Sequence, residues 1–526
     1  MTTLAARLVS LLAAHGIDTV FGIPGVHTVE LYRGLAGGGL RHVTPRHEQG
    51  AGFMAHGYAM ASGRPAACFV ITGPGVTNIA TAMAQAYADS VPMLVVSSVN
   101  PAGRAGSGDA HLHELPDQRR LMAGAAAFSH SIADPAELPQ VLARAFAVFA
   151  AARPRPVHIE IPVDRLGAEV ASASSPPARL ARPVPPPALL DQAASLLAAA
   201  RAPLLLLGGG AIEAAAAAGA LAEWLDAPAV MTVNARGLLP PDHPLGVSIS
   251  PSCPATRDLI EAADVVLAAG TELGPTDYDM YDRAPLAIPG TLIRLDLDPE
   301  QAVRNHPPAL ALIGDAASGL QALLDRLPPA RPSGSGAARA AAAREAGFAA
   351  FDPGTRADLA WLETVRETLP GAILVGDSTR QVYAGNLGFA AAAPRSWFNA
   401  ATGYGALGFG LPAAIGAGLA RPGRPVVCLC GDGGLQFSLA ELGTAIEAEV
   451  PVILLLLNNR GYGEIKSYML ARQIPPLGVD LHTPDFALIA RAYGWDAARI
   501  VDRDGLPDAL RGAAASGRAT LIEITA

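Results

Sequence analysis

The sequence predicts an α/β protein with three doubly wound domains, each built on a parallel sheet. Short apolar runs, typical of strands buried on both faces, alternate with longer segments of helical periodicity. Many of these runs end in glycine-rich loops, where the strands of such sheets pass into helices. The length of 526 residues exceeds what one hydrophobic core can use and favours about three domains.

The first domain is expected to span residues 1–168. It begins with an amphipathic helix and a strand that ends in the loop Gly22-Ile23-Pro24-Gly25, which continues neither helix nor strand. A second helix is expected around Leu31, and the loop at residues 72–75 should lead from a strand into a helix. The strands are predicted at 18–21, 41–44, 66–71, 91–97 and 157–163, and the later helices at 50–62 and 76–89.

Two proline-rich segments divide the chain, and both are predicted to be linkers. The first covers residues 169–188 and the second residues 328–354, which run into an Ala/Arg/Glu helix. They separate a middle domain at 189–327 from a C-terminal domain at 355–526. The middle strands are predicted at 203–207, 229–232, 265–268 and 292–297, and the C-terminal strands at 372–375, 425–430, 452–457 and 520–524.

Composition narrows the class of partner. A formal net charge of −9, with no basic block, argues against nucleic acid. The apolar runs are too short to span a bilayer, and the first residues lack the pattern of a secretory signal. The four cysteines form no CxxC pair, so a reduced, cytoplasmic protein is the expectation.

Polar residues follow two neighbouring strands of the C-terminal domain. One run ends in Gly431-Asp432-Gly433-Gly434, and the next ends in Asn458-Asn459. Because the carboxyl ends of parallel strands meet at one edge of a sheet, both should deliver oxygen ligands to the same place. An acid, an asparagine and a diphosphate suit Mg²⁺, and glycine N–H groups suit an anion. The pattern indicates a magnesium–diphosphate cofactor site, and the alternative is a tight strand–helix turn without a ligand.

Four motifs stand out along the chain: Gly431-Asp432-Gly433 with Asn458-Asn459, Arg46-His47-Glu48-Gln49-Gly50-Ala51, Thr72-Gly73-Pro74-Gly75-Val76-Thr77-Asn78, and the glycine-rich segment 403–412. Together they resemble the thiamine diphosphate enzymes of the acetolactate synthase and 2-oxo acid decarboxylase superfamily. The resemblance covers nearly the whole chain in order. It implies a pyrimidine-binding first domain, a middle domain and a diphosphate-binding third domain.

The resemblance also implies individual roles. Asp432, Asn459 and the carbonyl of Gly461 would bind Mg²⁺, and Glu48 would contact the pyrimidine ring and assist deprotonation of the cofactor. For Glu48 the alternative is an ordinary acid in the first turn of a helix. For Leu407, expected to wedge the bent cofactor, the alternative is a core leucine. The remaining cofactor-binding residues implied are Thr72, Asn78, Gly405, Gly431, Gly433 and Gly434.

Similarity to particular groups within this superfamily restricts the reaction that we expect. The segment 460–468 departs from the acetolactate synthase pattern by having an acid at Glu464. Segments 21–35, 46–57, 113–118 and 459–466 are more similar to the 5-guanidino-2-oxopentanoate (2-ketoarginine) decarboxylases of arginine catabolism. This implies non-oxidative decarboxylation to 4-guanidinobutanal and CO₂. The alternatives are an acetolactate synthase-like carboligase and a non-catalytic cofactor-binding regulatory homologue.

A guanidinium substrate needs a carboxylate that accepts two parallel N–H bonds. Glu464, beside the expected metal loop, is the first candidate, and Asp377, Glu114 and Asp109 are the others. For each of them the alternative is a solvated surface acid. Decarboxylation also ends with a proton transfer, for which histidine is suited at neutral pH. His113 and His27 are the candidate proton donors, and His111 is placed with the substrate residues.

Two further expectations concern the middle domain and assembly. Gly208-Gly209-Gly210 follows a strand but does not form a GxGxxG fingerprint, so FAD is not favoured although some relatives bind it. The resemblance implies that thiamine diphosphate lies between the first domain of one subunit and the third domain of another. A homodimer or homotetramer acting on a small 2-oxo acid is therefore expected.

Overall fold

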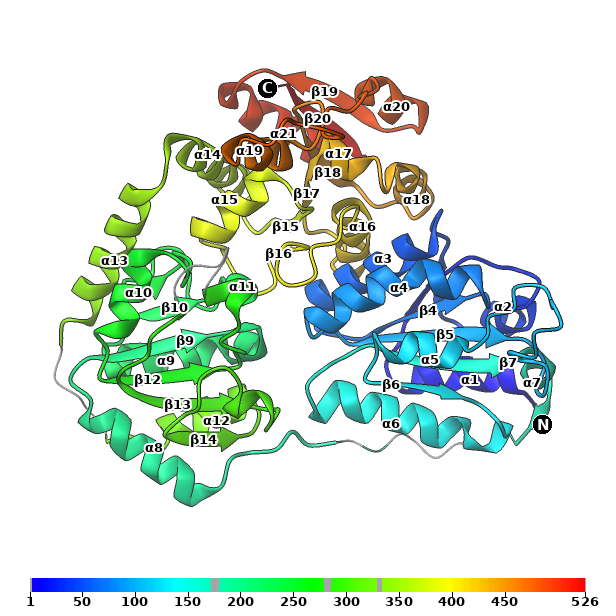
Figure 1. The fold of residues 1–526 in the computed structure, drawn as a ribbon, viewed down its shortest axis with the longest axis horizontal. Coiled ribbons are helices and arrows are strands. Elements are labelled where there is room, and N and C mark those ends of the chain that lie inside the picture. The colour runs from blue at the N-terminus through cyan, green and yellow to red at the C-terminus, as the bar shows by residue number, and fades with distance from the viewer. Residues whose placement is uncertain (1, 172–177, 179, 279–284, 329–333, 526) are drawn as a thin grey trace. The chain divides into compact units, whose positions relative to one another are not determined.

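A computed structural model describes residues 2–171, 178, 180–278, 285–328 and 334–525. The chain forms two compact units (Figure 1). One unit comprises residues 1–181, 375–378 and 399–526, and the other comprises 182–374 and 379–398. The predicted linkers fall partly on residues 172–177, 179 and 329–333, which lie outside the described residues.

The N-terminal domain has a six-stranded sheet in the order β3-β2-β4-β5-β7-β6, in which all paired strands are parallel. Its central strands β4 and β5 are buried along their whole length, as expected for strands covered on both faces. The strands are β2 (Thr19–Gly22), β3 (Arg41–Val43), β4 (Ala66–Val70), β5 (Met93–Val99), β6 (Phe128–Ser131) and β7 (Val157–Pro162). The helices are α1 (Leu4–Ala14), α2 (Val29–Ala36), α3 (Glu48–Ser62), α4 (Pro74–Ala88), α5 (Gln118–Ala123), α6 (Leu138–Ala151) and α7 (Val163–Leu166).

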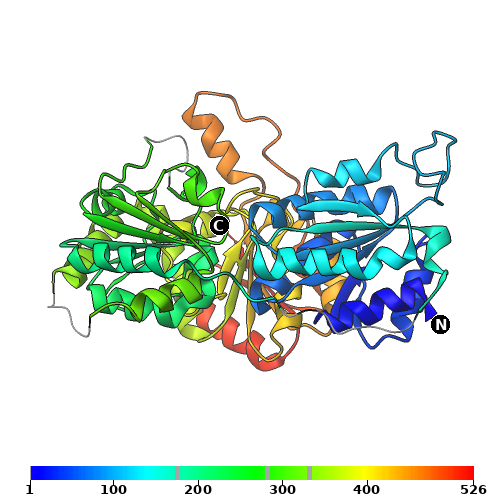
Figure 2. The same ribbon diagram turned by 90° about the horizontal axis from the view of Figure 1, so that it is seen from below.

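Helices cover both faces of this sheet. Leucines of α1 and phenylalanines of α6 share one hydrophobic core with alternate residues of the strands. Helices α3 and α4 pack together on the opposite face (Figures 1 and 2). A short antiparallel pair, β1 (Thr2–Thr3) with β8 (Glu169–Val170), joins the two ends of the domain.

The C-terminal domain repeats this plan with the strand order β16-β15-β17-β18-β20-β19. Strands β17, β18, β20 and β19 run parallel. The strands are β15 (Ile373–Gly376), β16 (Trp397–Asn399), β17 (Val426–Gly431), β18 (Val452–Asn458), β19 (Asp496–Ile500) and β20 (Thr520–Thr525). The helices are α16 (Gly410–Ala420), α17 (Asp432–Leu435), α18 (Leu442–Glu447), α19 (Gly463–Ala471), α20 (Phe486–Ala492) and α21 (Leu506–Ser516).

The N- and C-terminal domains form a single unit because α3 packs closely on α16. A glycine on each helix allows this approach. A Cβ atom on Gly57 would overlap the backbone of Ala413, and a Cβ atom on Gly416 would overlap the backbone of Met54. The contact places the helix that starts at Glu48 against the domain that carries the expected metal loop.

The middle domain also has a six-stranded parallel sheet, in the order β11-β10-β9-β12-β13-β14. The strands are β9 (Pro203–Leu207), β10 (Ala229–Met231), β11 (Gly246–Val247), β12 (Val265–Ala269), β13 (Thr291–Asp296) and β14 (Leu310–Ile313). The helices are α8 (Pro187–Ala199), α9 (Ala215–Leu225), α10 (Pro254–Glu261), α11 (Pro275–Tyr278) and α12 (Ala316–Leu324), followed by α13 (Gly336–Ala350), α14 (Pro353–Thr368) and α15 (Arg380–Gly388).

These three sheets confirm the predicted fold class. Among the residues described above, no helix combines the length and apolar character needed to cross a membrane.

Candidate active site

Glu48 is the first residue of α3, and the fold fixes its carboxylate. His47 caps the helix by accepting a hydrogen bond from the Gln49 backbone at Nδ1 (3.1 Å). The Glu48 side chain is nearly buried, and its Oε2 accepts a hydrogen bond from Nδ2 of Asn78 at 2.9 Å. Asn78 lies in the first turns of α4, so both residues come from helix starts at the same edge of the sheet. The structure therefore brings together two residues that the sequence places thirty positions apart.

The turn before Glu48 is held by Glu441, which the sequence gave no reason to single out. Glu441 is 2% exposed and accepts hydrogen bonds from the backbones of Arg46 (3.0 Å) and His47 (3.2 Å) and from the Thr444 hydroxyl (2.6 Å). Burial raises the pKa of Glu441. Its carboxyl oxygen occupies the space that a Cβ on Gly50 would take, which explains why a glycine stands in the first turn of α3.

The Thr72 loop is fixed by a second buried residue, Gln118. Its Oε1 accepts hydrogen bonds from the Thr72 hydroxyl at 2.9 Å and from the Gly73 backbone at 3.0 Å. Its Nε2 donates to Ser97 (3.1 Å) and to Glu160 (3.1 Å). The amide is thus saturated, as a buried polar group must be to avoid a large desolvation cost. Thr72 consequently serves to hold this loop in the described structure.

His27 and His113 are brought together at the same edge. Their ring centroids are 5.3 Å apart, and the Nδ1 atom of each is buried without a hydrogen-bond partner among the described residues. Burial, and then the nearby His113, lower the pKa of His27. His113 adopts a left-handed backbone conformation with φ of 60°, which positions its carbonyl against the Thr72–Gly73 loop. A pair of imidazoles with unsatisfied nitrogens is equipped to exchange protons with a ligand.

Glu114 and His111 have a different environment. The Glu114 carboxylate accepts hydrogen bonds from the backbones of Gly108 (2.8 Å) and His111 (3.0 Å) and from the Ser107 hydroxyl (3.1 Å). These bonds, first that from Gly108, lower the pKa of Glu114. Glu114 therefore braces its own loop in this structure, which argues against the substrate contact expected of it. His111 joins this loop through its backbone, and its Nε2 is buried without a partner among the described residues.

The expected metal residues converge at the carboxyl ends of β17 and β18. Asp432 is fully buried, and its Oδ1 accepts a hydrogen bond from the Asn459 backbone at 3.3 Å. The end of the Asn459 side chain lies 3.0 Å from that Oδ1 and 2.9 Å from the Gly461 carbonyl oxygen. In the hydrogen-bonded arrangement the amide nitrogen of Asn459 donates to both of these oxygens. Turning the amide by 180° would present its oxygen instead and would complete a set of three hard oxygens of the kind that suits Mg²⁺.

An orphaned atom supports the fit of a cation. Oδ2 of Asp432 is buried and has no hydrogen-bond partner among the described residues, a costly state for a carboxylate. Burial raises the pKa of Asp432, as expected when no cation balances its charge. The residues present therefore fit a magnesium ion. Asp432 is the first residue of the short helix α17, and Gly433 and Gly434 follow it, so the backbone N–H groups of this first turn lie beside the carboxylate.

The segment between β16 and α16 carries the other expected cofactor residues. Gly405 is exposed and has φ of 78°, a conformation that favours glycine. Leu407 is half-buried, and the neighbouring Gly408 also has a positive φ of 80°. The bare, solvent-facing backbone at Gly405 and the partly exposed leucine leave this segment accessible to a ligand.

The remaining candidates for a substrate contact differ in burial. Asp377 is fully buried and accepts hydrogen bonds from the backbones of Gly410 and Ser378, both at 2.8 Å. Burial raises its pKa to about 6. This environment argues against the expected substrate contact and gives Asp377 the role of holding the turn before α16. Glu464, in contrast, lies exposed in the first turn of α19, directly after the metal loop, while Asp109 is exposed in the Glu114 loop.

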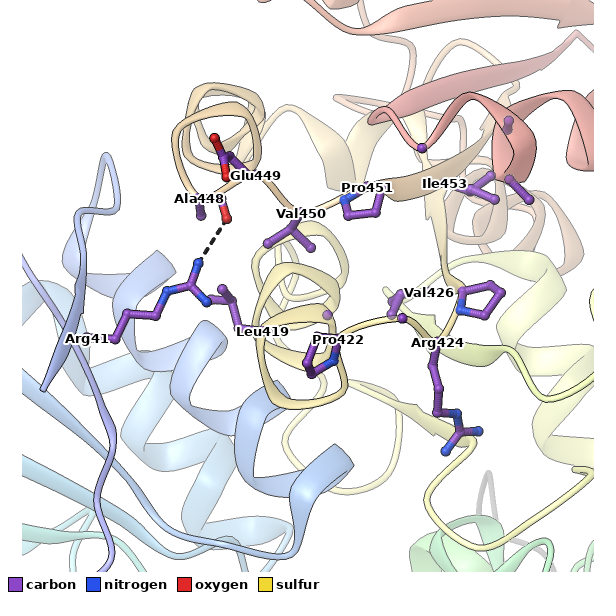
Figure 3. Close-up of a pocket in the computed structure, with 16 residues that line it drawn as sticks. Arg41, Leu419, Pro422, Arg424, Val426, Ala448, Glu449, Val450, Pro451 and Ile453 are labelled. Atoms are coloured by element: carbon purple, nitrogen blue, oxygen red, sulfur yellow. Dashed lines mark hydrogen bonds between the residues drawn. The ribbon is translucent and has the colours of Figure 1, made fainter. Parts of the chain in front are cut away.

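Two other features lie apart from this site. In the middle domain, Gly208 and Gly210 pack against Gly270 across the ends of β9 and β12, so close packing accounts for the glycine run. In the first unit, a cavity of about 500 Å³ lies at the amino ends of β17 and β18, beside Arg41, which donates a hydrogen bond to the Ala448 carbonyl at 3.0 Å (Figure 3). The cavity is at the opposite end of these strands from Asp432.

Comparison with known proteins places the chain in one family. Three parts of it match the thiamine pyrophosphate enzymes: residues 2–121 match the N-terminal TPP binding domain, 190–323 the central domain and 375–524 the C-terminal TPP binding domain. The chain therefore belongs to the thiamine pyrophosphate enzyme family. This confirms the resemblance seen in its motifs and the expected three-domain fold.

Individual relatives refine this assignment. A protein of Pseudomonas aeruginosa named "Probable 2-ketoarginine decarboxylase" is 50% identical over 99% of this chain and 94% of its own length. A probable acetolactate synthase large subunit of Methanocaldococcus jannaschii is 30% identical over 99% and 91%. The large subunit of acetolactate synthase isozyme 2 of Escherichia coli is 31% identical over 96% and 92%. The similarity to a decarboxylase supports the expected enzyme class, a thiamine diphosphate-dependent carboxy-lyase.

Proposed function

We propose that this enzyme catalyses the thiamine diphosphate- and Mg²⁺-dependent decarboxylation of 5-guanidino-2-oxopentanoate, releasing 4-guanidinobutanal and CO₂. The observation that carries the proposal is the 50% identity, over almost the entire chain, with a protein named as a 2-ketoarginine decarboxylase. The grouping of Glu48 with Asn78, and of Asp432 with Asn459 and Gly461, supports an intact cofactor site.

Thiamine diphosphate, when bound, supplies the carbon nucleophile and the electron sink that removal of CO₂ from a 2-oxo acid requires. Asp432, Asn459 and the Gly461 carbonyl would hold the metal, and the N–H groups of Gly433 and Gly434 would hold phosphate oxygens. Glu48, anchored through one oxygen by Asn78, keeps its other oxygen available to hold a proton against the pyrimidine ring. Gly405 and Leu407 would receive that ring from the other side.

The histidine pair would complete the reaction. After CO₂ leaves, the former carbonyl-bearing carbon must gain a proton before the aldehyde departs. His27 and His113 have buried Nδ1 atoms without partners, so both can exchange a proton with a bound group. The lowered pKa of His27 keeps it neutral at pH 7, and we assign the proton donation to His113 with His27 as its neighbour.

Glu464 is the proposed partner of the substrate guanidinium. It is exposed and follows the metal loop immediately, so a side chain extending from the reaction centre can reach it. A carboxylate there would accept paired N–H bonds from a guanidinium group. Replacement of Glu464 by Gln should raise KM for 2-ketoarginine far more than KM for pyruvate.

Self-association is proposed because α19 has no buried residue, although it adjoins the metal loop. Ile465, Tyr468 and Leu470 are 55%, 53% and 56% exposed, a sizeable apolar surface for one short helix. Figure 2 shows this helix, in orange, standing clear of the sheet that precedes it. A second copy of the chain that brings its Glu48 to this site would cover the apolar surface of α19.

A reducing compartment such as the cytoplasm is consistent with four free, buried cysteines.

The test compares kcat/KM for 2-ketoarginine, pyruvate and apolar 2-oxo acids, with products identified by NMR. The proposal predicts the highest value for 2-ketoarginine and an aldehyde as the product. The acetolactate synthases at 30–31% identity provide the second candidate, a carboligase. Acyloin formation from pyruvate at a higher kcat/KM would establish that alternative and reject the proposal.

A further inference from the structure

A buried polar network closes the turn that carries Gly405. This turn, Ala400–Ala406, joins β16 to the segment before α16 and is tied across its ends by a backbone hydrogen bond from Gly405 to Ala400 (3.1 Å). One side chain from the N-terminal domain spans the same two ends. Gln85 donates from Nε2 to the Ala400 carbonyl at 3.1 Å and accepts at Oε1 from the Ala406 backbone at 3.0 Å.

Gln85 is itself fixed by Asp89, one turn later at the C-cap of α4. The second hydrogen of Nε2 is donated to Oδ2 of Asp89 at 2.7 Å, while Oδ1 of Asp89 accepts the hydroxyl of Thr402, within the turn, at 2.8 Å. Gln85 is fully buried and the Asp89 side chain is 2% exposed. Nε2 of the buried His56, on α3, lies 3.5 Å from Oδ2 of Asp89. Such bonds are directional, and water does not compete for them at this depth.

Helices α3 and α4 carry both the Glu48–Asn78 pair and side chains of the buried network. Helix α3 begins at Glu48 and reaches His56 two turns later, while α4 carries Asn78 near its start and Gln85 near its end. Each helix therefore begins near the Glu48 carboxylate, and its later turns contribute a side chain to the network at the Ala400–Ala406 turn. Packing of α3 against α16 keeps the two domains in the register that these bonds need.

We propose that Gln85 and Asp89 are positioning residues of the cofactor site: by closing the Ala400–Ala406 turn they hold Gly405 and Leu407 in the arrangement that receives the pyrimidine ring. Neither side chain reaches the ligand, because both are buried beneath the turn. The inference rests on the proposed function, since it assigns the turn to thiamine diphosphate.

The test uses Gln85→Met, which keeps the length of the side chain and removes every hydrogen bond. With the full-length protein and Mg²⁺, calorimetry should show the Kd for thiamine diphosphate rising by about tenfold or more, and hydrogen exchange at the amides of Gly405 and Ala406 should accelerate. The matched control is Gln321→Met. Gln321 makes the same i,i+4 bond to an aspartate, Asp325, at 2.9 Å, but this bond lies on the exposed side of α12, so neither the Kd nor the exchange rate should change.

Thr402→Val is a second test variant, which changes the turn itself and leaves the sequence of α4 unchanged. Loss of its hydroxyl bond to Asp89 should raise Kd by about threefold and accelerate exchange in the same turn. If exchange accelerates while Kd stays at the wild-type value in both variants, or if exchange does not change, the positioning role is refuted. Wild-type protein that binds no thiamine diphosphate would instead refute the proposed function.

Discussion

Glu48 has the geometry of a group that is held for one task. It is the first residue of helix α3. The turn before it is held by the buried carboxylate of Glu441, which accepts a hydrogen bond from the Arg46 backbone, and one oxygen of Glu48 accepts a hydrogen bond from Asn78. A first-turn glutamate that served only the helix dipole would need none of these contacts, and it would contribute about 0.3–1 kcal/mol wherever it lay in the turn. The contacts thus favour the catalytic interpretation.

Glu48→Gln should lower kcat by about a hundredfold or more, since general acid–base groups typically contribute 10²–10⁴-fold. Thiamine diphosphate binding should stay measurable, because the residues proposed to hold the metal and the phosphate, Asp432, Asn459 and Gly433-Gly434, are unchanged. Glu30→Gln is the control, since Glu30 forms a surface ion pair with Arg33. A Glu48→Gln enzyme with wild-type kcat would remove Glu48 from the mechanism.

His113→Gln should raise the pKa of His27. Burial is the larger cause of its lowered pKa and remains, whereas the repulsion from His113 is lost, so the pKa should move upward yet stay below 6.5. NMR titration of the histidine Cε1–H resonances measures it directly. His15, whose pKa is lowered by burial alone, should titrate as before in the same spectra. An unchanged or lowered pKa of His27 would contradict the pairing.

Among the elements, buried central strands were predictable and most edge strands were not, although the edge strand β3 was expected at 41–44 and forms at Arg41–Val43. The middle strand β9 lies at the expected residues, and β4 differs at one end by one residue, because each is an unbroken apolar run. Strands β6 and β19 were missed. Both lie at sheet edges and are only half-buried; β6 (Phe-Ser-His-Ser) has a single apolar residue, and β19 (Asp-Ala-Ala-Arg-Ile) does not alternate polar with apolar residues, so their sequences carry no periodic signal.

The same reasoning explains which site residues could be anticipated. The convergence of Asp432 and Asn459 follows from the rule that parallel strands end at one edge. Glu441, Gln118, Gln85 and Asp89 were missed because a polar residue in a helix looks solvent-exposed until the element packed on it is known. The burial of Asp377 was likewise invisible, because its partners are backbone groups supplied by a distant turn.

The α3–α16 contact can be tested through its glycines. Gly416→Ala should destabilise the protein by about 1–3 kcal/mol, because the added methyl overlaps the backbone of Met54, which cannot rotate away. Gly512→Ala on α21 meets no atom within 4 Å and should be neutral or slightly stabilising, as alanine favours helices. Denaturant unfolding of both variants measures the difference. Equal stabilities would show that the helices are not in close contact.

At the scale of the whole molecule, the exposed face of α19 predicts self-association. Leu470→Glu should shift the protein towards monomer in analytical ultracentrifugation and lower the specific activity most at low protein concentration. Leu488→Glu provides the control, since Leu488 is 63% exposed on α20, a different helix of the same domain. A fully active Leu470→Glu monomer would show that one chain contains a complete site.

The proposed reaction is the decarboxylation of a guanidino 2-oxo acid with thiamine diphosphate and a magnesium ion. The most direct measurement is CO₂ release from 5-guanidino-2-oxopentanoate by purified protein, with the cofactor and Mg²⁺ added together, singly and not at all. We expect turnover only when both are present, with one aldehyde formed per CO₂. Turnover that is independent of thiamine diphosphate, or no CO₂ release in the complete mixture, would contradict it.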